Sequence, residues 1–285
     1  MRLIAFSDEN FIPVVQNLVS SLDKIYPHAP LTYYMVGFHR KNCLKSENLK
    51  ISYKTFFPKS GLPNLNFLKP SILLQSLTDH EDDVFIFLDS DITIGKRFNP
   101  ESILQKNLEL PLASFGPYEL PYTFRTFEGG RTETYTPDLL MDYFGIRSKS
   151  MRYVQNCLIA YHRKHQNFLL EWESICLNKY LLKEHWRYFS FQDETAFNVL
   201  LWKYSATENL GHIFVNTHKF TTFQLIEESE NIVNVNIDEN PYEFCGESSK
   251  IMFYHGTKDT NQNLKIQKYI YENYTGNPRT SPYTS

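Results

Sequence analysis

The sequence predicts an α/β fold with a mostly parallel central sheet that is flanked by helices. Three observations lead to this fold class. Short apolar runs alternate with segments in which apolar residues recur every three or four positions, a pattern typical of strands and amphipathic helices. The run Val84–Leu88 is apolar throughout, as expected for a strand buried on both faces. A chain of 285 residues that is 42% hydrophobic can bury the core that such a domain needs.

The elements alternate along the chain in the order that a parallel sheet requires. We expect strands at residues 2–6, 31–36, 51–56, 84–88, 110–115, 154–160, 212–216 and 251–254. We expect helices at residues 11–25, 70–77, from 100 onward, at 165–183 and at 192–203. Pro13 and Pro70 fit because the first turn of a helix tolerates proline. Residues 116–136 and 227–249 are rich in turn-forming residues and are expected to be loops.

No internal repeat or low-complexity linker divides the chain. We therefore expect one domain over residues 1–275 and a disordered tail over residues 276–285. The net charge of −3 gives no overall reason to expect nucleic acid, and the four widely spaced cysteines are typical of reduced thiols. No segment approaches the roughly 18 apolar residues of a membrane helix, and the apolar start is too short for a signal peptide. We expect a cytoplasmic protein, at most peripheral to a membrane, either monomeric or homodimeric.

Two carboxylates mark the end of the apolar strand at residues 84–88. Asp89 and Asp91 stand two positions apart, at the edge where open α/β sheets bind their ligands. Because neighbouring carboxylates repel each other, a divalent cation such as Mg²⁺ or Mn²⁺ would stabilise the pair. An ordinary solvated turn is the alternative, since Asp and Ser also favour turns and a short D-x-D occurs often by chance.

Other polar residues stand close to predicted helix starts. Ser7 and Asp8 follow the first strand and are candidates for binding a nucleoside, although Asp8 is equally suited to capping the helix. Lys69 precedes the helix that Pro70 opens, from where it could reach a phosphate or a sugar hydroxyl. A solvated lysine is the simpler interpretation at that position. Acidic Asp193 and Glu194 at another helix start suit the helix dipole without any further role.

Five short segments carry a resemblance to a known group of enzymes. They are Ala5–Asp8, Phe87–Asp91, Gln155–Leu158, Gln192–Asn198 and His255–Lys258. In this order and spacing they resemble the nucleotide-sugar glycosyltransferases of the GT-A fold, most closely family 8, the glycogenin and galactosyltransferase-like group. The resemblance spans about residues 3–260 and implies a single Rossmann-like GT-A domain.

The resemblance also implies an activity and a set of site residues. The implied reaction moves a hexose or N-acetylhexosamine from a UDP-sugar to a hydroxyl of a glycan, protein or other acceptor, with retention of configuration. The metal ligands would be Asp89, Asp91 and His255, and an imidazole ligand favours Mn²⁺ over Mg²⁺. Residues expected to bind the donor are Ser7, Asp8, Lys69, Ser90, Gly256 and Lys258. Residues expected at the reaction centre are Asp193, which would contact the transferred sugar, Gln192 and Asn156.

Two alternatives remain beside this hypothesis. A nucleotidyltransferase could use the same sheet architecture, but residues 5–10 lack the glycine-rich phosphate loop that usually opens such enzymes. A glycosyltransferase-like protein could bind a sugar nucleotide or a glycan without catalysis. The presence of Asp89, Asp91, His255 and Lys258 argues against that loss of activity.

Overall fold

The structure is a computed structural model of the whole chain. It describes residues 1–58, 65–94, 98–104, 109–115, 124–128, 131–135, 145–146, 154–178, 193–204, 214–219, 222–226, 232–236 and 253–255. For residues 102, 104, 114–115, 124–128 and 131–135, and for those from 214 onward, the description is limited to the backbone. The predicted tail at residues 276–285 lies outside the described residues, so the expected domain limits remain a prediction.

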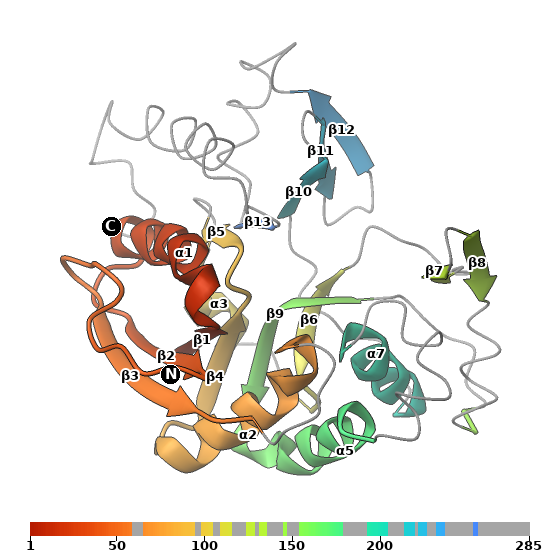
Figure 1. Cartoon of the computed structure of the whole chain (residues 1–285), viewed down its shortest axis with the longest axis horizontal. Helices are drawn as coiled ribbons and strands as arrows, with labels where there is room; N and C mark the ends of the chain where they lie inside the picture. The colour runs from red at the N-terminus through yellow and green to blue at the C-terminus, as the bar shows by residue number, and fades with distance from the viewer. Residues whose placement is uncertain are drawn as a thin grey trace.

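A six-stranded, mostly parallel sheet forms the centre of the fold (Figure 1). Its order is β3 (Lys50–Phe56), β2 (Pro30–Val36), β1 (Arg2–Ser7), β4 (Val84–Leu88), β9 (Val154–His162) and β6 (Leu112–Phe115). Strands β3, β2, β1 and β4 pair in parallel, whereas β9 runs antiparallel to both β4 and β6. The predicted fold class is confirmed.

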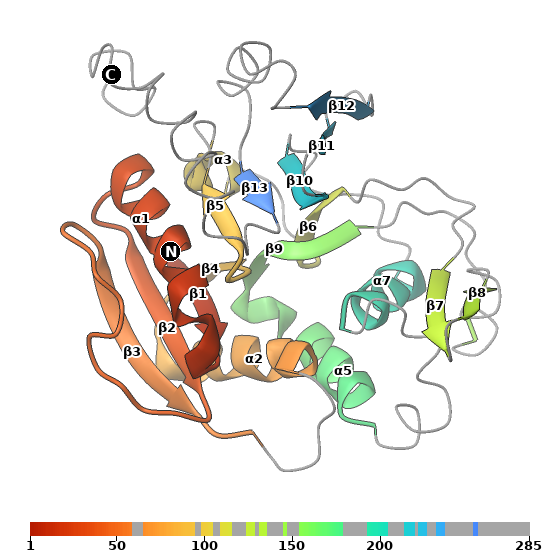
Figure 2. The same cartoon turned by 45° about the horizontal axis from the view of Figure 1, so that its top comes forward.

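Helices cover both faces of this sheet, as Figure 2 shows after a turn of the view. Helix α1 (Ile12–Ile25) packs on one face with the odd-numbered residues of β1, including Leu3 and Ala5. Helices α2 (Lys69–Asp79) and α5 (Gln166–Cys176) pack on the other face with Ile4 and Phe6. This division follows from the two-residue period of a strand, which sends successive side chains to opposite faces. The structure also describes the short helices η1 (Glu9–Phe11), η2 (Leu65–Leu68), α3 (Pro100–Leu104) and η3 (Arg163–His165).

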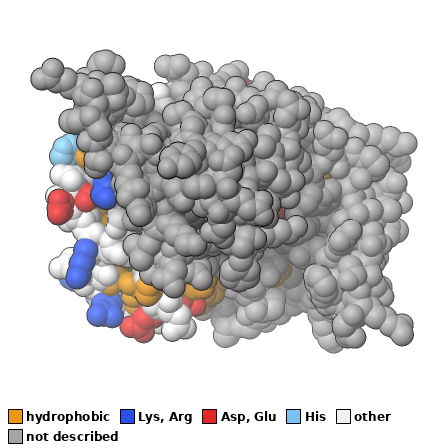
Figure 3. All heavy atoms as spheres, turned by 90° about the horizontal axis from the view of Figure 1, so that it is seen from above, with side chains coloured by type: hydrophobic (Ala, Val, Ile, Leu, Met, Phe, Trp, Pro, Cys, Tyr) orange, Lys and Arg blue, Asp and Glu red, His pale blue; other side chains and the backbone are white. Residues whose placement is uncertain are grey.

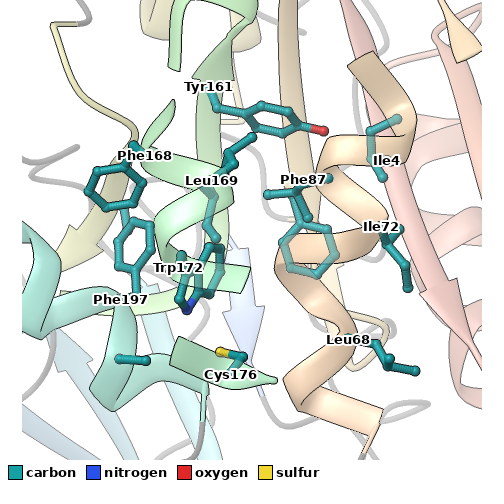
Figure 4. Close-up of a cluster of buried hydrophobic side chains, with 14 of the residues drawn as sticks. Ile4, Leu68, Ile72, Phe87, Tyr161, Phe168, Leu169, Trp172, Cys176 and Phe197 are labelled. Carbon is teal, nitrogen blue, oxygen red and sulfur yellow. The ribbon is translucent and has the colours of Figure 1, made fainter. Parts of the chain in front are cut away.

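An aromatic cluster fixes α7 (Asp193–Lys203) against the second face of the sheet (Figure 4). The ring of Trp172 on α5 packs edge-on against Phe197 on α7, with centroids 4.8 Å apart. Phe168 contacts Phe197 in the same way, and all three side chains are buried. Burial of large aromatic surfaces is strongly favourable, so these contacts hold α7 against α5.

The structure also contains a second sheet, of five strands. The sequence predicted strands at residues 212–216 and 251–254 but did not predict that they belong to a separate sheet. Its order is β12 (Ile232–Asn236), β11 (Thr222–Ile226), β10 (Phe214–Lys219), β13 (Phe253–His255) and β5 (Ile92–Ile94). Strand β5 begins one residue after Asp91 and pairs antiparallel with β13, so that Ile92 lies opposite His255. The sheet therefore brings the D-x-D segment next to a strand from the far end of the chain.

The two predicted loops both contain strands, and these predictions were wrong. Residues 116–136 include the hairpin of β7 (Phe124–Glu128) and β8 (Arg131–Tyr135), and residues 227–249 include β12. Gly129 and Gly130 separate β7 from β8, and a Gly-Gly pair is a hairpin signal that the surrounding prolines obscured. The helix predicted over residues 165–183 begins at Gln166 and ends at Cys176 within the described residues.

The structure also bears on the predictions about membrane helices and cysteines. No helix in the described ranges is long and apolar enough to cross a membrane. Cys43, Cys157 and Cys176 are free thiols, as predicted, and Cys245 lies outside the described residues. Figure 3 shows one face of the molecule, on whose described part acidic and basic side chains lie among apolar ones.

Candidate functional site

The site lies where β1 and β4 end, at the carboxyl edge of the parallel strands. Ser90, between the two aspartates, donates its hydroxyl hydrogen bond to the carbonyl of Phe6 on β1. The amide of Asp89 donates to the carbonyl of Cys157 on β9, 2.8 Å away. These two bonds join the D-x-D turn to the strands on either side of it. The turn is therefore part of the sheet edge rather than a free loop.

The first predicted pair, Ser7 and Asp8, occupies the neighbouring strand end. The Ser7 hydroxyl lies 2.6 Å from the hydroxyl of Tyr33 on β2. The Asp8 carboxylate accepts a hydrogen bond of 3.1 Å from the amide of Phe11 and is the N-cap of η1. The capping interpretation of Asp8 is thus confirmed, and its contact with a nucleoside stays a prediction.

Lys69 is the centre of the described site. Its side chain is buried, with 2% of the residue exposed, so the interpretation as a solvated lysine is wrong. The ammonium lies 3.2 Å from Asp89 Oδ1 and 3.2 Å from Asp193 Oδ2. It also donates to Asn156, at 3.0 Å from the side-chain oxygen and 3.2 Å from the carbonyl. Asp89, Asn156 and Asp193, which the sequence assigned to the site from three separate segments, therefore all contact Lys69.

Asp193 is held from several directions at the start of α7. Its Oδ2 atom accepts a hydrogen bond of 2.7 Å from the side-chain amide of Asn156, in addition to the contact with Lys69. Its backbone carbonyl accepts a bond of 2.9 Å from the indole of Trp172. Only 3% of the residue is exposed. The carboxylate of Asp193 is thus fixed in orientation before any ligand binds.

The charged groups of this cluster shift one another's pKa values. Burial alone would lower the pKa of Lys69, but the nearby Asp193 and Asp89 outweigh it and raise that pKa above its ordinary value. Burial raises the pKa of Asp89, and Asp91 and Asp193 add to the rise, whereas Lys69 opposes it. The negative charge of Glu194 also raises the pKa of Lys69. Among the described residues, the carboxylates of Asp89, Asp91, Asp193 and Glu194 and the ammonium of Lys69 are therefore electrostatically linked.

A metal site at this strand end remains a prediction. Within the described ranges, no three His, Cys, Asp or Glu side chains form a group that could hold a metal ion. Asp89 and Asp91 are suitable oxygen ligands, and Asp91 is buried. The backbone of His255 lies opposite Ile92, next to Asp91, while its side chain is outside the description. If the His255 imidazole joined the two carboxylates, such a donor set would suit Mn²⁺.

Three other predicted residues, Gln192, Gly256 and Lys258, lie outside the described residues. The sequence interpretation also missed contributors. The Glu194 carboxylate accepts a hydrogen bond from the amide of Asn156, and the Asn198 side chain bonds both backbone groups of Val154. Both belong to the segment that carried the resemblance, but the sequence contains no signal for their partners on β9.

Comparison with known proteins finds a similar fold but no similar sequence. Neither a protein-family profile nor a curated protein matches this sequence. Among solved structures, the chain is similar to the apo structure of the WbbM bifunctional glycosyltransferase, with a TM-score of 0.60 and 12% sequence identity. The match covers 100% of this chain and 50% of that chain, so this chain spans half the length of that protein. The chain thus shares its α/β fold with a glycosyltransferase.

Proposed function

We propose that the chain is a metal-dependent glycosyltransferase of the GT-A type. It would transfer a hexose or N-acetylhexosamine from a UDP-sugar to a hydroxyl of a glycan, protein or other acceptor. The observation that carries this proposal is the cluster in which Lys69 contacts Asp89, Asn156 and Asp193 at the carboxyl edge of the sheet. The order of the sequence motifs and the fold shared with a glycosyltransferase support it.

The metal would be held by Asp91, with Asp89 and His255 as further ligands. Lys69 already contacts both oxygens of Asp89, at 3.2 and 3.4 Å, which makes Asp91 the better direct ligand. A divalent cation bound there would offset the negative charge of the diphosphate leaving group. Lys258, which follows β13 by three residues, would add a second positive charge to that group.

The remaining residues would bind and orient the donor. Ser7 and Asp8 stand at the end of β1, where they would contact the nucleoside, and Ser90 and Gly256 would border the phosphates. Asp193 would contact the transferred sugar and stabilise positive charge that develops on its anomeric carbon. Asn156 would keep the Asp193 carboxylate in place through the bond of 2.7 Å, and Gln192 would lie beside the reacting carbon. Retention of configuration belongs to the same proposal.

The experiment is an assay of UDP release. The purified chain is incubated with UDP-glucose, UDP-galactose, UDP-N-acetylglucosamine or UDP-N-acetylgalactosamine, each with Mn²⁺ or with EDTA. We expect Mn²⁺-dependent UDP release with at least one donor, and a loss of about 100-fold in Asp193→Asn, as expected when a fixed electrostatic group is removed. Glu47→Ala, which removes an exposed carboxylate, should keep the wild-type rate.

Two results would overturn the proposal in different ways. If no donor releases UDP and UDP with Mn²⁺ does not raise the melting temperature, the chain has no nucleotide-sugar site. If UDP with Mn²⁺ raises the melting temperature but none of the donors is cleaved, even with added glycan acceptors, the chain binds sugar nucleotides without catalysis.

A further inference from the structure

Strand β9 contains a bulge beside the site. In its pairing with β6, Ala113 lies opposite Ile159, but the next residue, Ser114, lies opposite Gln155. The segment Asn156–Leu158 therefore falls between two consecutive pairs of the ladder. A bulge of this kind interrupts the hydrogen bonds between the strands and redirects the side chains next to it.

Side chains from other segments bind the backbone that the bulge releases. The amide of Asn156 donates to Glu194 Oε2 at 3.2 Å, and its carbonyl accepts from Lys69 at 3.2 Å. Buried backbone groups need such partners, because an unpaired one costs about as much as a lost hydrogen bond. Within the described residues, Glu194 is the only hydrogen-bond acceptor for the backbone amide of Asn156.

The first turns of α7 hold β9 at a second point, two residues before Asn156. The Asn198 side chain accepts from the amide of Val154 at 2.8 Å and donates to its carbonyl at 2.9 Å. Asn198 also donates to the carbonyl of Glu194, at 2.9 Å, which ties the two anchoring residues together. Helix α7 therefore fixes β9 on the N-terminal side of the bulge and within it.

We propose that Glu194 is a positioning residue. Its carboxylate binds the backbone amide of Asn156 and so holds the bulge of β9, which keeps the Asn156 side chain between Lys69 and Asp193. Without this acceptor, the Asn156 amide would regain a partner by re-pairing with β6. Closing the bulge would shift β9 by three residues, an odd number, which sends the shifted side chains to the opposite face and would withdraw the Asn156 side chain from Asp193. The inference rests on the proposed function, because Asn156 and Asp193 are there assigned to the donor sugar.

The test distinguishes the hydrogen-bond acceptor that Glu194 provides from its negative charge. Glu194→Gln keeps an oxygen that can accept from the Asn156 amide, Glu194→Ala removes it, and Glu194→Asp withdraws it by one methylene. Backbone hydrogen exchange of Asn156 is measured for each variant, together with Mn²⁺-dependent UDP release and calorimetric binding of Mn²⁺–UDP. Glu47→Ala is the matched control, since it removes an exposed carboxylate far along the chain from α7.

We expect Glu194→Ala and Glu194→Asp to speed exchange at Asn156 by at least about 10-fold, because the protecting hydrogen bond is lost. They should lower the rate of UDP release by about 100-fold, the effect of a small misplacement, while the affinity for Mn²⁺–UDP stays within about 2-fold. Glu194→Gln should retain both exchange protection and the rate of UDP release. Glu194→Asp keeps the test valid if the alanine variant does not fold.

The inference is overturned if exchange at Asn156 is unchanged in both shortened variants, or if Glu194→Gln loses as much activity as Glu194→Ala. Failure of the proposed function is a separate outcome. In that case the wild-type chain neither binds UDP nor cleaves a donor, while faster exchange in Glu194→Ala would still show that Glu194 holds the bulge.

Discussion

Lys69→Met is the change that should disturb this molecule most clearly. The substitution keeps an unbranched side chain of similar length but removes the ammonium that contacts Asp89, Asp193 and Asn156. Removing one partner of a buried ion pair costs about 3–5 kcal/mol, because the remaining charge is left uncompensated. Asp193 is 3% exposed and should show this cost in full, whereas the Asp89 side chain is 25% exposed and is partly screened by water. We therefore expect a loss of about 3 kcal/mol in the free energy of unfolding.

The loss should also depend on pH. Burial already raises the pKa of Asp89 to about 7, and Lys69 opposes that rise, so the variant should raise this pKa further. A carboxyl whose pKa is higher in the folded state than in the unfolded chain binds its proton on folding. Its folded form is therefore favoured at low pH and loses stability as the pH rises from about 4 through the folded pKa. The difference between variant and wild type should be smaller at pH 5 than at pH 8.

Urea unfolding in EDTA, at both pH values, measures these effects. Lys203→Met is the matched control, because Lys203 pairs with Glu171 on the surface and its side chain is 48% exposed. An exposed pair of this kind contributes less than about 1 kcal/mol. If Lys69→Met costs no more than Lys203→Met, or if its cost is the same at pH 5 and pH 8, the buried charge cluster described above is incorrect.

Three further predictions concern the core, a loop and the metal. Phe197→Ala should lose about 3–5 kcal/mol in urea unfolding, because Phe197 is fully buried against Trp172; a loss below about 1 kcal/mol would contradict that packing. Asp23→Ala should lose about 2 kcal/mol at pH 7, because the Asp23 carboxylate accepts bonds from the Ser46 hydroxyl and the amides of residues 47–49. Burial opposes these bonds, but together they lower the pKa of Asp23, so its contribution should vanish as the pH falls below about 4, as acid titration of wild type and variant would show. Dialysis against EDTA should remove the rise in melting temperature that UDP produces, and added Mn²⁺ should restore it; a rise that survives EDTA would exclude a metal-dependent site.

The parallel half of the fold could be predicted because burial determines its sequence pattern directly. The strand predicted at residues 84–88 is β4, residue for residue, and α1 follows its apolar period from Ile12 to Ile25. Strand β13 overlaps the strand predicted at residues 251–254, whereas β5 spans three residues and is too short to show a period. They form because Ile92–Ile94 and Phe253–His255 pair with each other, and pairing between distant segments is not encoded in either segment alone.

The sequence could place several of these residues in one region, but it could not predict the contacts between them. Motif order assigned Asp89, Asn156 and Asp193 to one region, and the structure brings all three to Lys69. A lysine before a helix carries no sign that its partner is 87 residues away, so its burial was missed. The hydrogen bond from the Asn156 amide to Glu194 was hidden for the same reason, since it depends on a bulge that only the pairing of β6 with β9 defines.

Calorimetric titration of UDP into the protein tests the central claim most directly, namely that the acidic strand end at Asp91 binds a nucleoside diphosphate through a divalent cation. With Mn²⁺ present, we expect saturable binding of UDP to the wild-type chain. In EDTA, or in Asp91→Ala with Mn²⁺ present, the affinity should fall by about 100-fold, as expected when a direct metal ligand and its phosphate contact are lost. Binding of UDP that is equally strong in wild type, in Asp91→Ala and in EDTA would contradict the claim, as would the absence of binding to the wild type with Mn²⁺.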